Sequence, residues 1–210
     1  RFGAAAPAPV RAPTLRLSAS MAPLRILGAT LAAAAWQALA TTTTVPAADL
    51  RAAAAGLTDI DGAPLGDSFA SGVTLITNVA SQCGYTDVNY RQLTELDAAL
   101  GGKGLKIVGF PCNQFGAQEP GTAEEIKTFA AGYNAKWTLT EKVDVNGPNT
   151  APLWKLLKGN GGDVRWNFFT KFLLSCGAQS CEVTRFEEPE PSKLRKHIES
   201  ALQSQRGGEL

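Results

Sequence analysis

Histidine is nearly absent from this chain: its 210 residues include only His197. The four cysteines contain no Cys-x-x-Cys pair, so a zinc site of the usual cysteine–histidine kind lacks ligands, and we expect no metal. A Ser–His or Cys–His catalytic couple would have to use His197, which lies in a polar C-terminal stretch typical of a solvated helix. The sequence therefore has little capacity for histidine-based catalysis.

Acidic residues are missing from residues 1–48, which carry four arginines and are rich in alanine, proline and threonine. The remaining chain has a formal charge of −3, four less than the total of +1, so nucleic acid is not expected as a partner of the folded part. The longest apolar run, over 26–40, is shorter than the roughly 20 residues that a membrane-spanning helix needs.

The acid-free segment has the layout of a targeting signal. From Met21, a positive flank at Arg25 is followed by the alanine-rich apolar run over 26–40, which ends in small residues as a secretory signal does. An arginine-rich, acid-poor composition also suits transit to a plastid or mitochondrion. We expect 1–48 to be a targeting presequence or a disordered tail and 49–210 to be the folded domain. If the segment is only a tail, the protein stays in the cytoplasm.

After a short predicted strand and turn over 57–62, the folded part continues with a strand, a helix and a second strand. Residues 73–77 are β-branched and apolar and follow a glycine, which predicts a buried strand. Apolar residues then recur at helical spacing up to Leu100, and 105–110 form a second apolar strand. A helical crossover between two short apolar strands predicts a parallel pair.

Cys83 lies where the first of these strands passes into the helix. In an open α/β sheet, ligands bind at the carboxyl ends of the strands. A helix N-terminus offers unpaired N–H groups and a partial positive charge that favours a thiolate, the nucleophilic form of cysteine. Position alone is equally compatible with a small buried core cysteine, so the choice depends on the rest of the chain.

The second half of the folded part predicts further helices and a hairpin. A Thr-x-x-Glu pattern at Thr122 is typical of a capping box, and 152–157 form a short apolar helix. Residues 169–174 and 182–186 are predicted strands joined by a turn, and Pro191 begins the last helix. The order β-α-β followed by α-β-β-α predicts an α/β, thioredoxin-like fold with a central mixed sheet flanked by helices.

Three motifs occur in order along this part of the chain. They are Asn-Val-Ala-Ser-Gln-Cys-Gly-Tyr-Thr over 78–86, Gly-Phe-Pro-Cys-Asn-Gln-Phe-Gly-Ala-Gln-Glu-Pro-Gly over 109–121, and Trp-Asn-Phe over 166–168. Together they resemble the glutathione peroxidase family in order and spacing, and the resemblance runs from about Asp59 to Leu202. It implies a thioredoxin-like fold and the cysteine-containing, non-selenium, phospholipid-hydroperoxide type of that family.

The resemblance implies that Cys83 is the peroxidatic cysteine and that Gln118, Trp166 and Asn167 complete the site. Peroxide reduction needs a thiolate that attacks one oxygen and donors that stabilise charge on the leaving oxygen. Neutral amide and indole groups suit the second task, because they offer N–H without adding a charge. The expected function is reduction of hydrogen peroxide and of organic or lipid hydroperoxides to water and alcohols, as an antioxidant thiol peroxidase.

Restoring the thiol requires glutathione or thioredoxin as reducing co-substrate, and no bound cofactor is expected. Thioredoxin-using relatives carry a resolving cysteine in the helix after the second motif, whereas 126–133 has none. Cys112 lies at the site end of the second strand and could approach Cys83, but this position is usually not the resolving one in the family, so the resemblance implies a packing role. Cys176 and Cys181 would lie roughly 20 Å or more from Cys83 if their strand runs away from the site, so we expect them to be irrelevant to turnover.

Two features depart from the family pattern. Cys176 and Cys181 flank the predicted hairpin turn, and directly opposed residues there would have Cα atoms about 4.5 to 5.5 Å apart, within the range of a disulfide. In a reducing compartment the two would instead be free thiols. In addition, Phe168 and Phe169 make one residue more than the family's usual Trp-Asn-Phe-Thr, which predicts a shifted or bulged third strand.

Two other classes of function would use the same residues. A peroxide sensor would relay oxidation from Cys83 to a partner protein, and a non-catalytic thioredoxin-fold interaction protein is expected if Cys83 is inert. A dithiol oxidoreductase is disfavoured, because Cys-Gly-Tyr-Thr lacks the second cysteine. Tetrameric relatives carry a longer loop than the short 148–165 segment, so the resemblance implies a monomer whose site admits bulky hydroperoxides.

Overall fold

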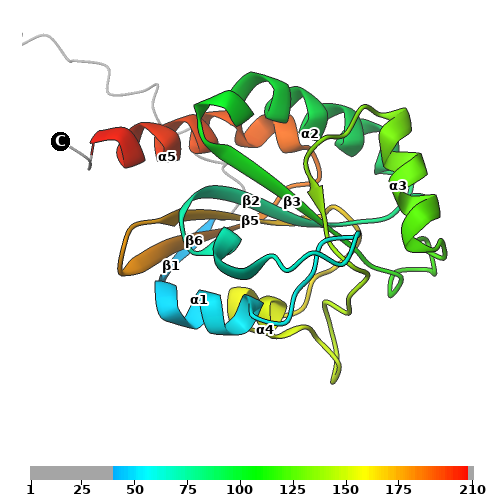
Figure 1. Cartoon of the computed structure of the whole chain (residues 1–210), viewed down its shortest axis with the longest axis horizontal. Helices are drawn as coiled ribbons and strands as arrows, with labels where there is room; N and C mark the ends of the chain where they lie inside the picture. Colours follow the sequence, from blue (N-terminus) through cyan, green and yellow to red (C-terminus); the bar gives the residue numbers. More distant parts are fainter. Residues whose placement is uncertain (1–39, 208–210) are drawn as a thin grey trace, which may run out of the picture. The chain divides into compact units, whose positions relative to one another are not determined.

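The computed structural model describes residues 40–207, which form a six-stranded sheet with helices on both faces (Figure 1). The strands lie in the order β1-β6-β5-β2-β3-β4. Their bounds are β1 Thr41–Pro46, β2 Gly72–Val79, β3 Leu105–Pro111, β4 Thr138–Leu139, β5 Thr170–Cys176 and β6 Ser180–Glu187. The helices are α1 Ala47–Ala54, α2 Thr86–Leu100, α3 Ala123–Gly132, α4 Pro152–Lys158 and α5 Arg195–Gly207, with short 3-10 turns at Gly66–Phe69, Gly101–Lys103 and Pro191–Leu194.

The sheet is mixed, as the sequence predicts. β2 and β3 are parallel, and α2 is the crossover between them. β4 continues the parallel part, whereas β5, β6 and β1 are added antiparallel on the other side of β2. Because β2 lies in the middle and all but its first residue are buried, its carboxyl end is held firmly at the centre of one sheet edge.

Alternate residues of the central strands face two separate hydrophobic cores. Leu75 and Ile107 face the core that α2 and α5 cover, together with part of α3. Ile76 and Val108 face the opposite core, which α1 and α4 cover (Figure 1). This period-2 alternation is the pattern of a strand covered on both faces.

The predicted helix ends are confirmed where local chemistry defines them. The Thr122 hydroxyl accepts a hydrogen bond from the backbone N–H of Glu125, and the Glu125 carboxylate accepts one from the N–H of Thr122, so the capping box is complete. Pro191 begins a 3-10 turn that leads into α5 at Arg195, so the last α-helix starts four residues later than predicted.

The folded domain begins earlier than the predicted boundary at residue 49. Thr41–Pro46 pairs along its length with β6, and Ala47 is buried. This edge strand is a polar threonine run held mainly by backbone pairing, so hydrophobic pattern gives no sign of it. The remaining part of the expected presequence, residues 1–39, lies outside the described residues.

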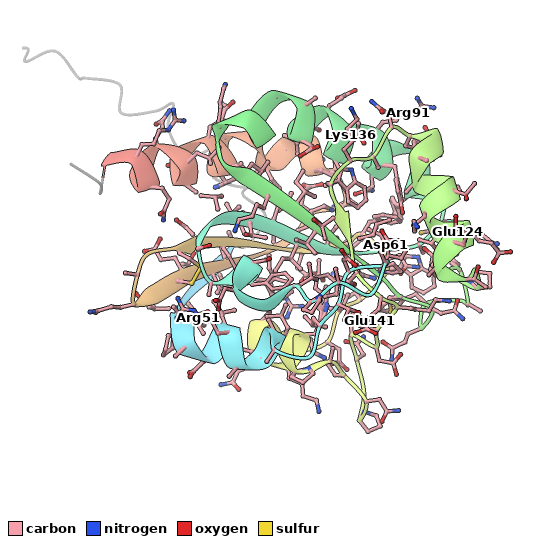
Figure 2. All side chains as sticks on the ribbon, in the orientation of Figure 1. Arg51, Asp61, Arg91, Glu124, Lys136 and Glu141 are labelled. Carbon is pink, nitrogen blue, oxygen red and sulfur yellow. A yellow bond between two sulfur atoms is a disulfide. The ribbon has the colours of Figure 1, made fainter. Side chains whose placement is uncertain are left out.

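The hairpin of β5 and β6 carries a disulfide between Cys176 and Cys181, visible as a yellow bond in Figure 2. The two residues are directly paired across the strands, as the sequence allows, and their Cα atoms are 3.9 Å apart. The bond ties the strand that neighbours β2 to the strand that holds β1. Among the described helices, none is long and apolar enough to cross a membrane.

Candidate active site

Cys83 lies in the turn between β2 and α2, where the sequence places it. The Thr86 hydroxyl accepts a hydrogen bond from the Cys83 backbone N–H at 3.1 Å and donates one to the Ala80 carbonyl at 2.7 Å. Thr86 is also the first residue of α2, and its N–H donates to the Cys83 carbonyl. These bonds fix the turn at the carboxyl end of the central strand. The cysteine is largely buried, with 8% of its surface exposed.

The loop after β3 is tied to this turn by two hydrogen bonds. The Gln82 backbone N–H donates to the Gln118 carbonyl at 3.0 Å. The Ser81 hydroxyl donates to the Glu119 carboxylate at 2.7 Å. Parallel pairing of β2 with β3 brings both loops to one edge of the sheet, so the predicted neighbourhood of Cys83 and Gln118 is observed.

The third motif enters the same site through Asn167, which is fully buried. Its side-chain N–H donates to the Gln118 side-chain carbonyl at 3.2 Å, and its own carbonyl accepts from the Asn78 side chain at 2.9 Å. The amides of Asn78, Asn167 and Gln118 therefore form a chain. In this hydrogen-bonded series the side-chain carbonyl of Gln118 accepts from Asn167, and the side-chain N–H groups of Gln118 stay available as donors.

Trp166 lies at the exposed rim of the site, with 39% of its surface accessible. Its ring packs on Phe115 of the Gln118 loop, with 5.7 Å between ring centroids. The structure therefore connects all three predicted donors to the turn of Cys83: Gln118 through backbone, Asn167 through Gln118, and Trp166 through packing.

The extra phenylalanine of the third motif lies in a turn before β5. The Phe169 N–H donates to the Trp166 carbonyl, and Phe168 adopts a left-handed conformation with φ of 65°. Such a backbone costs a bulky residue about 1 to 3 kcal/mol. The expectation of a shifted or bulged strand is wrong, because β5 pairs with β2 and β6 in unbroken register from Lys171 to Cys176. The turn takes up the extra residue.

Aromatic side chains outside the predicted site extend this rim. Tyr85 is 41% exposed and packs edge to face on Phe169, with 6.4 Å between centroids. The Arg165 guanidinium lies over the same Phe169 ring at 5.3 Å. Tyr85 belongs to the first motif, so the sequence places it near Cys83. Its contact with Phe169, which is distant in sequence, could not be predicted without the fold.

Glu119 is a second residue of the site that the motifs did not single out. It is fully buried, and burial raises the pKa of its carboxyl group, opposed by the hydrogen bond from Ser81. One carboxylate oxygen accepts from Ser81, whereas the other has no hydrogen-bond partner among the described residues. The Glu119 backbone N–H donates to Asn113, so this residue connects the whole loop to the Cys83 turn.

The other cysteines are separated from Cys83. Cys112 is fully buried in the core under α1 and α4, whereas Cys83 belongs to the core under α2 and α5. Burial raises the pKa of the Cys112 thiol. Cys176 pairs with Gly72 at the far end of β2, and seven residues of strand at about 3.3 Å each place it roughly 20 Å away. Cys112 begins the loop that carries Gln118, but its side chain packs in the core opposite to that of Cys83.

Within residues 40–207, no cluster of three or more histidine, cysteine or acidic side chains could hold a metal ion. The arrangement offers instead a buried thiol at a sheet edge and neutral N–H donors from two further loops. It is suited to a reaction in which a thiolate attacks and an oxygen leaves with negative charge.

Comparison with known proteins agrees with this geometry. The family model described as "Glutathione peroxidase" matches residues 54–158. The "Hydroperoxy fatty acid reductase Gpx2" of Synechocystis sp. is 50% identical over 151 residues, covering 70% of this chain and 96% of that protein. The crystal structure of T. cruzi GPX1 has a TM-score of 0.54 at 30% identity, covering 70% of this chain and 93% of that chain.

The fold extends to more distant proteins. A thiol:disulfide interchange protein of the thioredoxin family from Chlorobium tepidum TLS has a TM-score of 0.51 at 15% identity, covering 69% of this chain and 90% of that chain. At this identity the likeness concerns the fold alone. It confirms the predicted thioredoxin-like architecture.

Proposed function

The chain belongs to the glutathione peroxidase family and is a thiol peroxidase, and we propose that it reduces hydroperoxides through Cys83 as nucleophile. The Cys83 thiolate attacks the terminal oxygen of the hydroperoxide, and the O–O bond breaks. Cys83 becomes a sulfenic acid, and the leaving alkoxide takes a proton and departs as an alcohol, or as water from hydrogen peroxide. Two electrons pass from sulfur to the peroxide.

In this proposal Gln118, Asn167 and Trp166 stabilise the negative charge on the leaving oxygen. Their amide and indole N–H groups are neutral donors, and the chain of amides from Asn78 holds two of them in fixed orientation. Preorganised donors of this kind contribute most where water is excluded, as it is around the buried Asn167.

For the reductant we propose a small monothiol such as glutathione. The observation that carries this is that no disulfide joins Cys83 to another described cysteine: the Cys112 side chain packs in the opposite core, and Cys176 and Cys181 are bonded to each other at the far end of β2. In this proposal the sulfenic acid reacts with an external thiol to give a mixed disulfide and water. A second thiol then releases Cys83 and leaves as the oxidised disulfide.

We further propose that the substrates include bulky hydroperoxides with apolar chains and that the protein is a monomer. The rim of the site carries Tyr85 and Trp166, both exposed, and one relative at 50% identity is called a hydroperoxy fatty acid reductase. The segment 148–165 before Trp166 is short, so we propose that it does not enclose this rim.

The test is a turnover assay with hydrogen peroxide and with a fatty acid hydroperoxide, each driven by glutathione or by a thioredoxin system. We expect turnover with glutathione and its loss, to trace level, in Cys83→Ser. Cys112→Ser is the matched control and should retain turnover, because its side chain lies in the opposite core. Oxidation of Cys83 without turnover by either reductant would instead identify a peroxide sensor.

A further inference from the structure

Lys171, near the start of β5, is a fully buried lysine that forms no ion pair with any residue the structure describes. Its ammonium group instead donates to three backbone carbonyls. They are those of Phe168, of Glu188 at 2.8 Å and of Pro189 at 3.3 Å. Burying a charged lysine is costly unless every donor finds an acceptor, and here three N–H groups meet three carbonyls.

The three carbonyls belong to two segments that no strand pairing joins. Phe168 is the left-handed residue of the turn that follows Asn167. Glu188 and Pro189 lie in the connection between β6 and the 3-10 turn at Pro191–Leu194. Lys171 therefore fastens the turn that carries Asn167 to the chain beyond the neighbouring strand.

The bond to Phe168 acts at the strained point of that turn. A left-handed conformation in a bulky residue persists only where its surroundings hold it. The Phe168 N–H donates to the Asn78 carbonyl on one side, and the Phe168 carbonyl accepts from Lys171 on the other. Both peptide groups that flank this residue are thus fixed, and Asn167 is the residue directly before it.

We propose that Lys171 is a positioning residue for Asn167: by holding the Phe168 carbonyl it keeps the Asn167 side chain on Gln118, in the place where charge develops on the leaving oxygen. The proposal rests on the proposed function, because it assigns Lys171 to the oxidation of Cys83 and not to substrate contact. A displacement of about 1 Å at a reacting centre can cost on the order of 100-fold in rate.

The charge state of Lys171 gives this arrangement a pH dependence. Burial lowers the pKa of Lys171 to about 7, opposed by the charges of Glu188 and Glu187. A neutral amine has two N–H groups, so deprotonation removes one of the three bonds. The titratable and charged groups of the surrounding elements are Glu187 and Arg185 on β6, Glu188 and Glu190 after it, Lys193 in the 3-10 turn, His197 on α5 against Phe186, and Arg165 before the Asn167 turn.

The test compares the rate of Cys83 oxidation by hydrogen peroxide in the wild type, Lys171→Met, Asn167→Ala and the double variant, with the sulfenic acid trapped in quenched flow. We expect each single change to slow oxidation about 10-fold or more, and the double variant to be no slower than Asn167→Ala alone. The ratio of wild-type to Lys171→Met rates should fall as pH rises through about 7, because the wild-type amine then loses one of its three N–H donors.

Leu173→Ala is the matched control, since Leu173 is buried on the same face of the same strand, two residues farther from the turn. It should lower thermal stability and leave the oxidation rate unchanged. If Lys171→Met does not fold, Lys171→Arg, which keeps a charge and several donors, replaces it in the same cycle.

Several results would overturn the proposal: additive effects of the two substitutions, an unchanged oxidation rate in Lys171→Met, or failure of both Lys171 variants to fold, which would make the residue purely structural. A wild-type protein whose Cys83 is not oxidised at all would instead refute the proposed function, and the control variant would show the same result.

Discussion

At the scale of single residues, the amide chain from Asn78 to Gln118 couples the centre of the sheet to the donors of the site. Replacing Asn78 by alanine leaves the Asn167 carbonyl buried without its partner. We expect Asn78→Ala to cost about 1 to 3 kcal/mol of stability and to slow Cys83 oxidation roughly 10-fold, measured by chemical unfolding and by sulfenic-acid trapping. Thr77→Val, which removes the neighbouring buried bond to the Thr170 carbonyl, should lower stability without slowing oxidation.

Motif resemblance predicts Cys83, Gln118, Trp166 and Asn167 as the site from the sequence alone, because each stands in a distinctive stretch of the chain. Lys171 is different. A lysine two residues into a strand normally predicts a solvated face, and its burial here follows from the pairing of β5 between β2 and β6. The acceptors of its hydrogen bonds are backbone carbonyls, which carry no sequence signal.

At the scale of elements, the loop between β3 and α3 contains a carboxyl group whose ionisation opposes folding. Because the pKa of Glu119 is raised in the folded protein, this group binds a proton more tightly there than in the unfolded chain. Its contribution to stability therefore falls as pH rises from its unfolded pKa through its folded pKa. We expect Glu119→Gln, which can still accept from Ser81, to be more stable than the wild type at pH 8 and equally stable at pH 4.

Thermal unfolding at the two pH values checks this prediction. Glu124→Gln is a suitable control, because Glu124 projects from α3 into solvent, as Figure 2 shows, and pairs there with Lys127. It should change stability by less than about 1 kcal/mol at either pH. An equal gain in both variants would point to overall charge and away from the burial of Glu119.

The disulfide of the β5–β6 hairpin closes a very short loop. In the loop-entropy picture it contributes about 2 kcal/mol, so Cys176→Ala with Cys181→Ala should lower the unfolding midpoint modestly. Turnover of peroxide with glutathione should not change, because the pair lies at the far end of β2 from Cys83. Loss of thioredoxin-driven turnover in this double variant, with Cys83 still oxidised, would show that the pair does resolve the site.

At the scale of the whole molecule, the sheet includes an edge strand, β1, that the hydrophobic pattern of the sequence does not predict. We expect a protein that begins at Ala40 to keep wild-type stability, and one that begins at Ala47 to lose at least about 5 °C in melting temperature, because β6 then becomes an unprotected edge. Equal melting temperatures for the two truncations would show that β1 adds nothing to the fold.

The parallel pair of β2 and β3, the hairpin and the capping box are predictable because each has a local pattern: apolar runs, a turn between strands, a Thr-x-x-Glu spacing. The edge strand and the turn that takes up Phe168 are not. The edge strand β1 is a polar run that forms because its backbone pairs with the otherwise unpaired side of β6. The turn is a strained conformation that is held by hydrogen bonds of Phe168 to Asn78 and Lys171.

The placement of Cys83 and Cys112 in opposite cores also determines how this enzyme fails. A sulfenic acid with a neighbouring thiol is shielded quickly as an intramolecular disulfide, but here the Cys83 and Cys112 side chains belong to different hydrophobic cores. In the proposed mechanism each oxidised molecule therefore waits for a thiol from solution. When peroxide outpaces that supply, a second peroxide carries Cys83 to the sulfinic acid, from which ordinary thiols do not recover it. The working lifetime of the protein is therefore set by the thiol pool around it.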